Sequence, residues 1–150
     1  MSEQVSTFEH VNLNEVDPAS APFVSAAYTL QLMDVEKKAY VSGPDTKNPG
    51  VAGEYIQLVF AIAESPDFSG RRIYETMFPG NGTNKRLRRM ADASGFSQDD
   101  GQSVFEFLVS MKDQQARFVA PISEVERLNK KTNVTKKALA VNLWECSPVG

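Results

Sequence analysis

The chain has 150 residues, of which 41% are hydrophobic and 23% are charged, a composition ordinary for one globular domain. It lacks the run of roughly 18 to 20 apolar residues that a membrane helix needs, which excludes an integral membrane protein. One cysteine, Cys146, and one histidine, His10, exclude an intramolecular disulfide, a multi-cysteine metal site and a histidine cluster. Because residues 1–22 also lack a secretion signal, we expect a cytoplasmic protein without metal or cofactor.

The net charge of -3 is unevenly distributed along the chain. Residues 1–22 contain four acidic residues and no basic ones, so we expect a flexible acidic arm, or alternatively an edge strand. Residues 23–150, the expected folded domain, contain 16 basic and 15 acidic residues. Four basic residues lie within 85–89 and five within 127–137. Such blocks can hold a polyanion locally, or they can simply keep a surface soluble.

Alternating apolar residues predict five strands in the folded domain. The clearest is the second, in which Ile56, Leu58 and Phe60 point one way and Tyr55 the other. Turn-forming or polar residues predict long loops at 37–53 and 123–136 and a hairpin turn at 65–70. The expected strands are, in order, Phe23–Val35, Glu54–Ala63, Arg71–Phe78, Ala116–Ile122 and Lys137–Trp144.

Two helices are expected between the third and fourth strands. The first is expected to begin with Thr83 or Asn84 as its N-cap, to run to about Ser94 and to stop at Gly95. The second, about Val104–Lys112, follows the capping-box pattern that begins at Ser103. This order predicts a mainly β fold: a five-stranded Greek-key barrel of the oligonucleotide/oligosaccharide-binding (OB) type, with a two-helix insert. Another small barrel or a β-sandwich remains open, since strand order cannot be read from one sequence.

The residues for nucleophilic catalysis are not assembled in this sequence. The only imidazole lies in the expected arm, and Cys146 is interpreted as an incidental thiol near the C-terminus. The run from Gly80 to Lys85 is similar to a phosphate-binding loop but lacks the required Gly-Lys-Ser/Thr. We therefore expect a protein that is not an enzyme.

Basic residues indicate a binding surface for a polyanion. In an OB fold, the loops joining strands one to two and four to five border the ligand groove. Lys85 and Arg86 are expected in the first turn of a helix, where the dipole disfavours cations and an anionic partner would compensate. Basic side chains on both rims and on this helix would follow a phosphate backbone. The candidates are Lys37, Lys38 and Lys47 in the first loop, Lys130, Lys131, Lys136 and Lys137 in and beside the second, and Lys85, Arg86 and Arg89 on the helix.

Aromatic residues could add base stacking. Alternation places Tyr55 and Trp144 outside the core, although Tyr55 could instead pack under the loop and Trp144 could seal one end of the barrel. We expect Tyr74 and Phe78 to point inward, because the opposite phase would direct Glu75 into the core.

The chain resembles a phage-encoded family of single-stranded DNA-binding-like proteins built on the OB fold. The family similarly has a first strand ending in Glu-Lys, a Gly-led second strand, a Gly-Arg-Arg third strand and a basic helix ending in Ala-x-Gly. The resemblance covers residues 28–95 and is loose in the last two strands. The matching segments are Tyr28–Lys38, Gly53–Ile62, Phe68–Tyr74 and Leu87–Gly95.

The resemblance implies binding of single-stranded DNA in phage replication or recombination, with Arg71 and Arg72 as backbone contacts beside Tyr55. Replication or recombination proteins are then expected as further partners. The alternative hypothesis is a protein-interaction or virion-assembly module on the same barrel, without nucleic-acid binding. The sequence leaves open a homo-oligomer and the choice between DNA and RNA.

Overall fold

The computed structural model describes residues 12–15, 23–44, 47, 49–129 and 131–150. Most of the expected acidic arm, and Lys130, therefore lie outside the described residues. None of the helices in the described ranges is long and apolar enough to cross a membrane. The elements are η1 (Leu13–Glu15), β1 (Ala26–Val41), β2 (Ala52–Ile62), β3 (Arg72–Met77), α1 (Asn81–Ser94), α2 (Val104–Asp113), β4 (Arg117–Asn129), β5 (Val134–Val141) and η2 (Leu143–Glu145).

The strands form one antiparallel, five-stranded sheet in the order β3-β2-β1-β4-β5. The prediction of a mainly β fold with two helices between the third and fourth strands is confirmed. The prediction of a closed barrel is not confirmed, because no backbone ladder joins edge strands β3 and β5 anywhere in the described chain. The two edges nevertheless meet: the backbone N–H of Val141 on β5 donates to Oε1 of Glu75 on β3 at 3.1 Å.

The core lies between the inner face of the sheet and the two helices. Phe60 and Phe118 are fully buried and meet edge to face at 5.5 Å, as the alternation in their strands predicts. Helices α1 and α2 contribute Met90 and Leu108, which are also fully buried. Burial of each such side chain contributes roughly 1.5 to 3 kcal/mol to the free energy of unfolding. The sheet is therefore anchored where the helices cover it.

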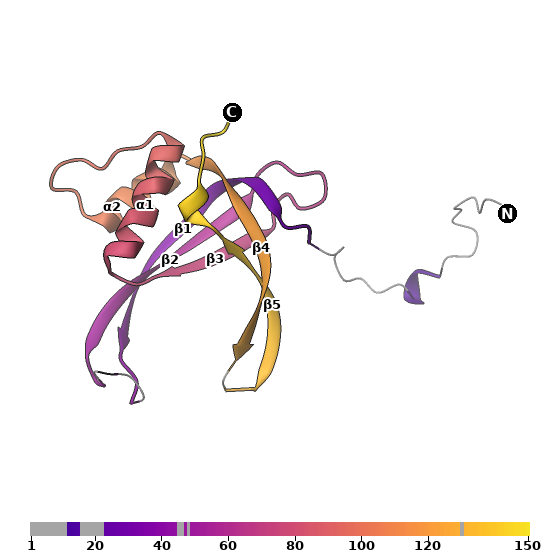
Figure 1. The fold of residues 1–150 in the computed structure, drawn as a ribbon, viewed down its shortest axis with the longest axis horizontal. Coiled ribbons are helices and arrows are strands. Elements are labelled where there is room, and N and C mark those ends of the chain that lie inside the picture. The colour runs from indigo at the N-terminus through magenta and orange to yellow at the C-terminus, as the bar shows by residue number, and fades with distance from the viewer. Residues whose placement is uncertain (1–11, 16–22, 45–46, 48, 130) are drawn as a thin grey trace.

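Two strands are longer than expected. β1 continues to Val41 and β4 to Asn129, so much of each predicted loop is strand, and the connections shrink to 42–51 and 130–133. Most residues of the extensions are exposed, whichever face they lie on, so the extensions lack the alternation that marks a half-buried strand. As a result β1–β2 and β4–β5 are long hairpins, which project away from the helices as two separate arms (Figure 1).

The first helix also begins earlier than predicted. Its N-cap is Gly80 and its first residue is Asn81, so Lys85 and Arg86 lie beyond the first turn, where the helix dipole acts weakly on them. The predicted stop is confirmed, because Gly95 is left-handed with φ 80°. For α2 the predicted N-cap is confirmed as well: Ser103 Oγ accepts a hydrogen bond from the N–H of Glu106 at 3.1 Å.

Candidate nucleic-acid interface

Strand β3 presents aromatic rings to solvent. Tyr74 is 52% exposed and Phe78, just after the strand, is 51% exposed, whereas Ile73 and Met77 are buried. The prediction that Tyr74 and Phe78 point inward is therefore wrong. Tyr74 pairs with Val59 of β2, which places both side chains on the outer face of the sheet.

Tyr74 and Phe78 point outward because Glu75, in the opposite phase of the strand, points inward. Its carboxylate is half-buried and accepts the hydrogen bond from Val141, and the positive charges of Arg127 and Arg86 lie near it. Burial raises the pKa of Glu75 above its ordinary value of 4.5, while the hydrogen bond and the two arginines act to lower the pKa. The cost of burying this carboxylate is thus partly offset by groups far away in the sequence.

Two further rings, those of Tyr40 and Tyr55, lie against the ring of Phe78. Tyr40, Tyr55 and Phe78 have ring centroids 5.4 to 6.0 Å apart, and Tyr55 lies on the outer face as its alternation predicts. The ring of Tyr40 covers Gly53, where a Cβ atom would lie only 2.7 Å from Tyr40 Cζ. Glycine at position 53 therefore leaves room for the Tyr40 ring to pack with Tyr55 and Phe78. We call the outer surface formed by Tyr40, Tyr55, Tyr74 and Phe78 the aromatic face.

The predicted basic contacts near this face divide between the two sides of the sheet. Arg72 shares the outer side with Tyr74 and is exposed. Lys38, opposite Tyr55, shares it too but pairs with Glu36 at 3.5 Å. Lys37 lies on the inner side, with Nζ 5.3 Å from the Phe105 ring centroid and 4.0 Å from Glu54. It is therefore already engaged by α2 and β2.

Neither Arg71 nor Arg72 lies beside Tyr55 as the resemblance implies, because Arg72 pairs with Ala61, at the other end of β2 from Tyr55. Arg71 precedes β3. It is half-buried, and its guanidinium carbon lies 5.4 Å from the ring centroid of Phe23. Its Nη1 atom is buried and has no hydrogen-bond partner in the described chain.

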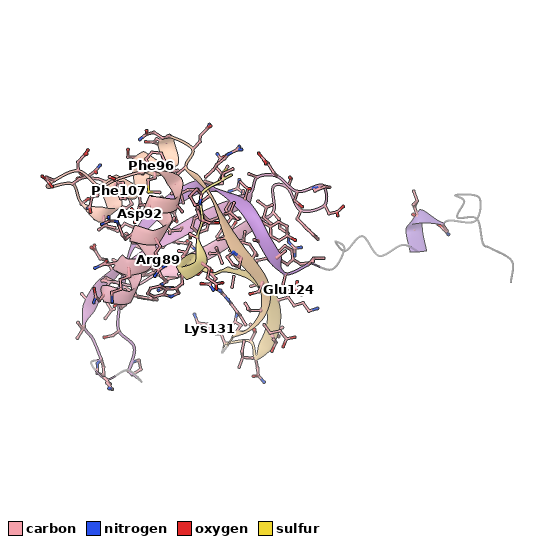
Figure 2. The ribbon with its side chains drawn as sticks, turned by 45° about the horizontal axis from the view of Figure 1, so that its top comes forward. Arg89, Asp92, Phe96, Phe107, Glu124 and Lys131 are labelled. Atoms are coloured by element: carbon pink, nitrogen blue, oxygen red, sulfur yellow. The ribbon has the colours of Figure 1, made fainter. Side chains whose placement is uncertain are left out.

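The β4–β5 hairpin carries most of the other predicted contacts. Lys131 lies in its turn, on the distal part of the hairpin in Figure 2, and Lys136 is exposed on β5. Lys137 pairs with Glu124 at 3.8 Å. Lys47 is exposed in the turn between β1 and β2. Within the described ranges Arg72, Lys131 and Lys136 have no ion-pair partner.

The predicted contacts on α1 belong to a different surface. Arg89 Nη1 donates to the Trp144 carbonyl oxygen at 3.2 Å, and its guanidinium carbon lies 5.5 Å from the indole centroid. Trp144 is 43% exposed, as expected, but it lies on η2, beyond the end of β5, so strand phase is not the reason for its exposure. Arg86 is half-buried and donates to Thr83 Oγ1 at 3.4 Å. Lys85 and Arg89 are both exposed there without an ion pair to any described residue.

A pocket of about 270 Å³ connects the aromatic face to the β4–β5 hairpin. It lies where the edges of β3 and β5 meet, and we call it the seam pocket. Tyr74 belongs to both the aromatic face and the seam pocket. The basic residues that line it are Arg71, Arg72, Arg127 and Lys137. Arg127 belongs to the basic block at 127–137 but is not among the predicted contacts, because the residues it meets at β3 are distant in sequence.

The described residues contain no group of three or more His, Cys, Asp or Glu side chains placed to hold a metal ion. Cys146 is half-buried, and burial raises the pKa of its thiol to about 11 against the opposing charge of Arg89. The thiol is therefore protonated, and weakly nucleophilic, at neutral pH.

Comparisons with protein-family models, with curated proteins and with solved structures found no match to this chain.

Proposed function

We propose that this protein binds single-stranded DNA without catalysis, on the aromatic face and along the β4–β5 hairpin, in phage-type replication or recombination. The observation that carries the proposal is the exposure of Tyr74 and Phe78 on the outer face of the sheet, where Arg72 is the neighbour of Tyr74. Stacking of a base on such a ring contributes roughly 1 to 3 kcal/mol and tolerates any sequence, because every base has a π face.

We further propose that the sheet is an OB-type barrel left open at the β3–β5 seam. The pairing of β1 with both β2 and β4 and the helices between β3 and β4 support this assignment. In that fold the ligand lies between the hairpin loops, which here carry the exposed Lys47 and Lys131.

Charge on the hairpin would supply the affinity for phosphates. Lys131 and Lys136 are exposed and lack ion pairs with any described residue, so they can exchange bound counterions for DNA phosphates. The proposal therefore predicts binding that weakens steeply as salt is added.

The test is the fluorescence anisotropy of a labelled thymidine oligonucleotide titrated with the protein at low and high salt, with a duplex competitor. We expect salt-sensitive binding that prefers the single strand and weakens in a Lys131→Gln, Lys136→Gln variant. A matched control is Arg88→Gln, Lys112→Gln, which removes two helix cations, each paired with a neighbouring aspartate. No anisotropy change at low salt and tens of micromolar protein would disprove the proposal.

One observation favours the second candidate, a protein-interaction module. A pocket of about 410 Å³ lies between α1 and α2, lined by Leu87, Phe96 and Phe107 among others. Figure 2 shows Phe96 and Phe107 on the helical side of the molecule. If this candidate function is correct, the same titration gives no change in anisotropy at either salt concentration, for the wild type and for variants of the aromatic face alike.

A further inference from the structure

The seam pocket gathers positive charge on one small concave surface. Four basic side chains line it, from β3 and the residue before it, from β4 and from β5, and none of the described carboxylates does. Two of the four are partly balanced by acids nearby, since Lys137 pairs with Glu124 at 3.8 Å and Arg127 lies near Glu75. Arg71 and Arg72 have no ion-pair partner among the described residues. Cations brought this close repel one another unless an anion joins them.

Arg71 adds an independent observation. Its guanidinium is held over the Phe23 ring, and its buried Nη1 has no hydrogen-bond partner within the described residues. Buried polar groups are nearly always hydrogen-bonded, and Arg71, which lines the pocket, carries a guanidinium nitrogen without an acceptor among the described residues. A phosphate oxygen is the acceptor that best matches a guanidinium.

The size and position of the pocket identify the source of such a phosphate. The volume of about 270 Å³ is several times the roughly 30 Å³ that a water molecule occupies, which leaves room for a phosphate group with adjoining sugar atoms. Tyr74 lines the pocket and also belongs to the aromatic face. A strand whose base stacks on Tyr74 therefore brings its backbone to the opening of the pocket.

We propose that the seam pocket binds one phosphodiester group of the single strand whose bases stack on the aromatic face. This inference rests on the proposed function for the source of the phosphate. The pocket then sets the path of the strand, from the outer face of β3 across the seam to the β4–β5 hairpin.

Arg72→Gln is the most direct variant, because Arg72 is exposed and its loss does not disturb the core. We expect affinity for the thymidine oligonucleotide to fall several-fold at 50 mM salt. The slope of log K against log salt should become shallower by about 0.7, the value for one phosphate contact with a single strand. Arg88→Gln, which removes an exposed helix arginine paired with Asp92, should change neither. Wild-type affinity and slope in Arg72→Gln would overturn the inference while leaving the proposed function intact.

A second arm follows the Arg71 side-chain Nε–H resonance of the wild-type protein by NMR. The oligonucleotide and inorganic phosphate are each titrated against sodium chloride of matched ionic strength. A shift with the oligonucleotide supports the inference. A shift with inorganic phosphate but not with the oligonucleotide would show that the pocket binds a free anion, and would overturn the proposal that it binds a phosphodiester group. A wild-type protein that binds no oligonucleotide would disprove the proposed function, and the phosphodiester with it.

Discussion

Tyr74 and Phe78 are the residues on which the proposed interface depends most. Their rings are exposed because strand alternation assigns the inward positions to Ile73, Glu75 and Met77. The exposed rings of Tyr74 and Phe78, with Arg72 next to Tyr74, provide apolar area and a cation on one surface, the combination that binds unpaired bases and their backbone.

Replacing Tyr74 with alanine should weaken binding of the thymidine oligonucleotide about 5- to 150-fold, the equivalent of the roughly 1 to 3 kcal/mol assigned to one stacked base. Tyr74→Phe keeps the ring and should bind nearly as well as the wild type. The measurement is the dissociation constant by anisotropy at fixed salt, with urea unfolding to verify that both variants fold. Equal affinity in the alanine and phenylalanine variants would contradict a stacking role.

At the scale of elements, the contact between β3 and β5 rests on a side chain rather than on a ladder. Glu75 accepts the hydrogen bond from Val141, which lies 66 residues further along the chain. Burial raises the pKa of this carboxyl in the folded state above its ordinary value of 4.5, so the folded protein retains the Glu75 proton to higher pH than the unfolded chain does.

The stability that Glu75 contributes is therefore fully present below about pH 4.5 and is lost as the pH rises through its folded-state pKa. Glu75→Gln keeps an acceptor oxygen for Val141 but does not titrate. The free energy of unfolding of the wild type minus that of Glu75→Gln should accordingly fall between pH 4.5 and 7, as measured by urea unfolding. A difference that is constant or rises with pH would show that the Glu75 pKa is not raised by folding. As a control, Glu75→Ala removes the acceptor and should cost about 1 to 3 kcal/mol.

The same elements show what the sequence could predict. The buried parts of the strands were found because apolar alternation marks residues such as Leu58 and Phe60. For the outer halves of β1 and β4 the sequence predicts loops, because a strand that is largely solvated on both faces has no such pattern. Tyr55 was placed correctly by its phase. The position of Tyr74 is predicted wrongly, because it depends on Glu75 pointing inward. The group that satisfies an inward Glu75 is the N–H of Val141, on a strand whose position in the sheet one sequence does not reveal.

At the scale of the whole molecule, the fold places the proposed contacts on one continuous path. The aromatic face, the seam pocket and the β4–β5 hairpin follow one another, with Tyr74 shared by the first two and Lys137 by the last two. The helices, with Arg89 and Trp144, form a separate surface. The net charge of -3 does not oppose this arrangement, since a local cluster of cations governs contact with a polyanion at short range.

The most direct test of this account is the mapping of backbone amide shifts by NMR as a thymidine oligonucleotide is added to the full chain. The account predicts shifts concentrated in β2, β3 and the β4–β5 hairpin, with Arg72 and Tyr74 among the largest, and little change around Phe96 and Phe107. Shifts confined to the pocket between α1 and α2, or no shifts at low salt, would contradict it.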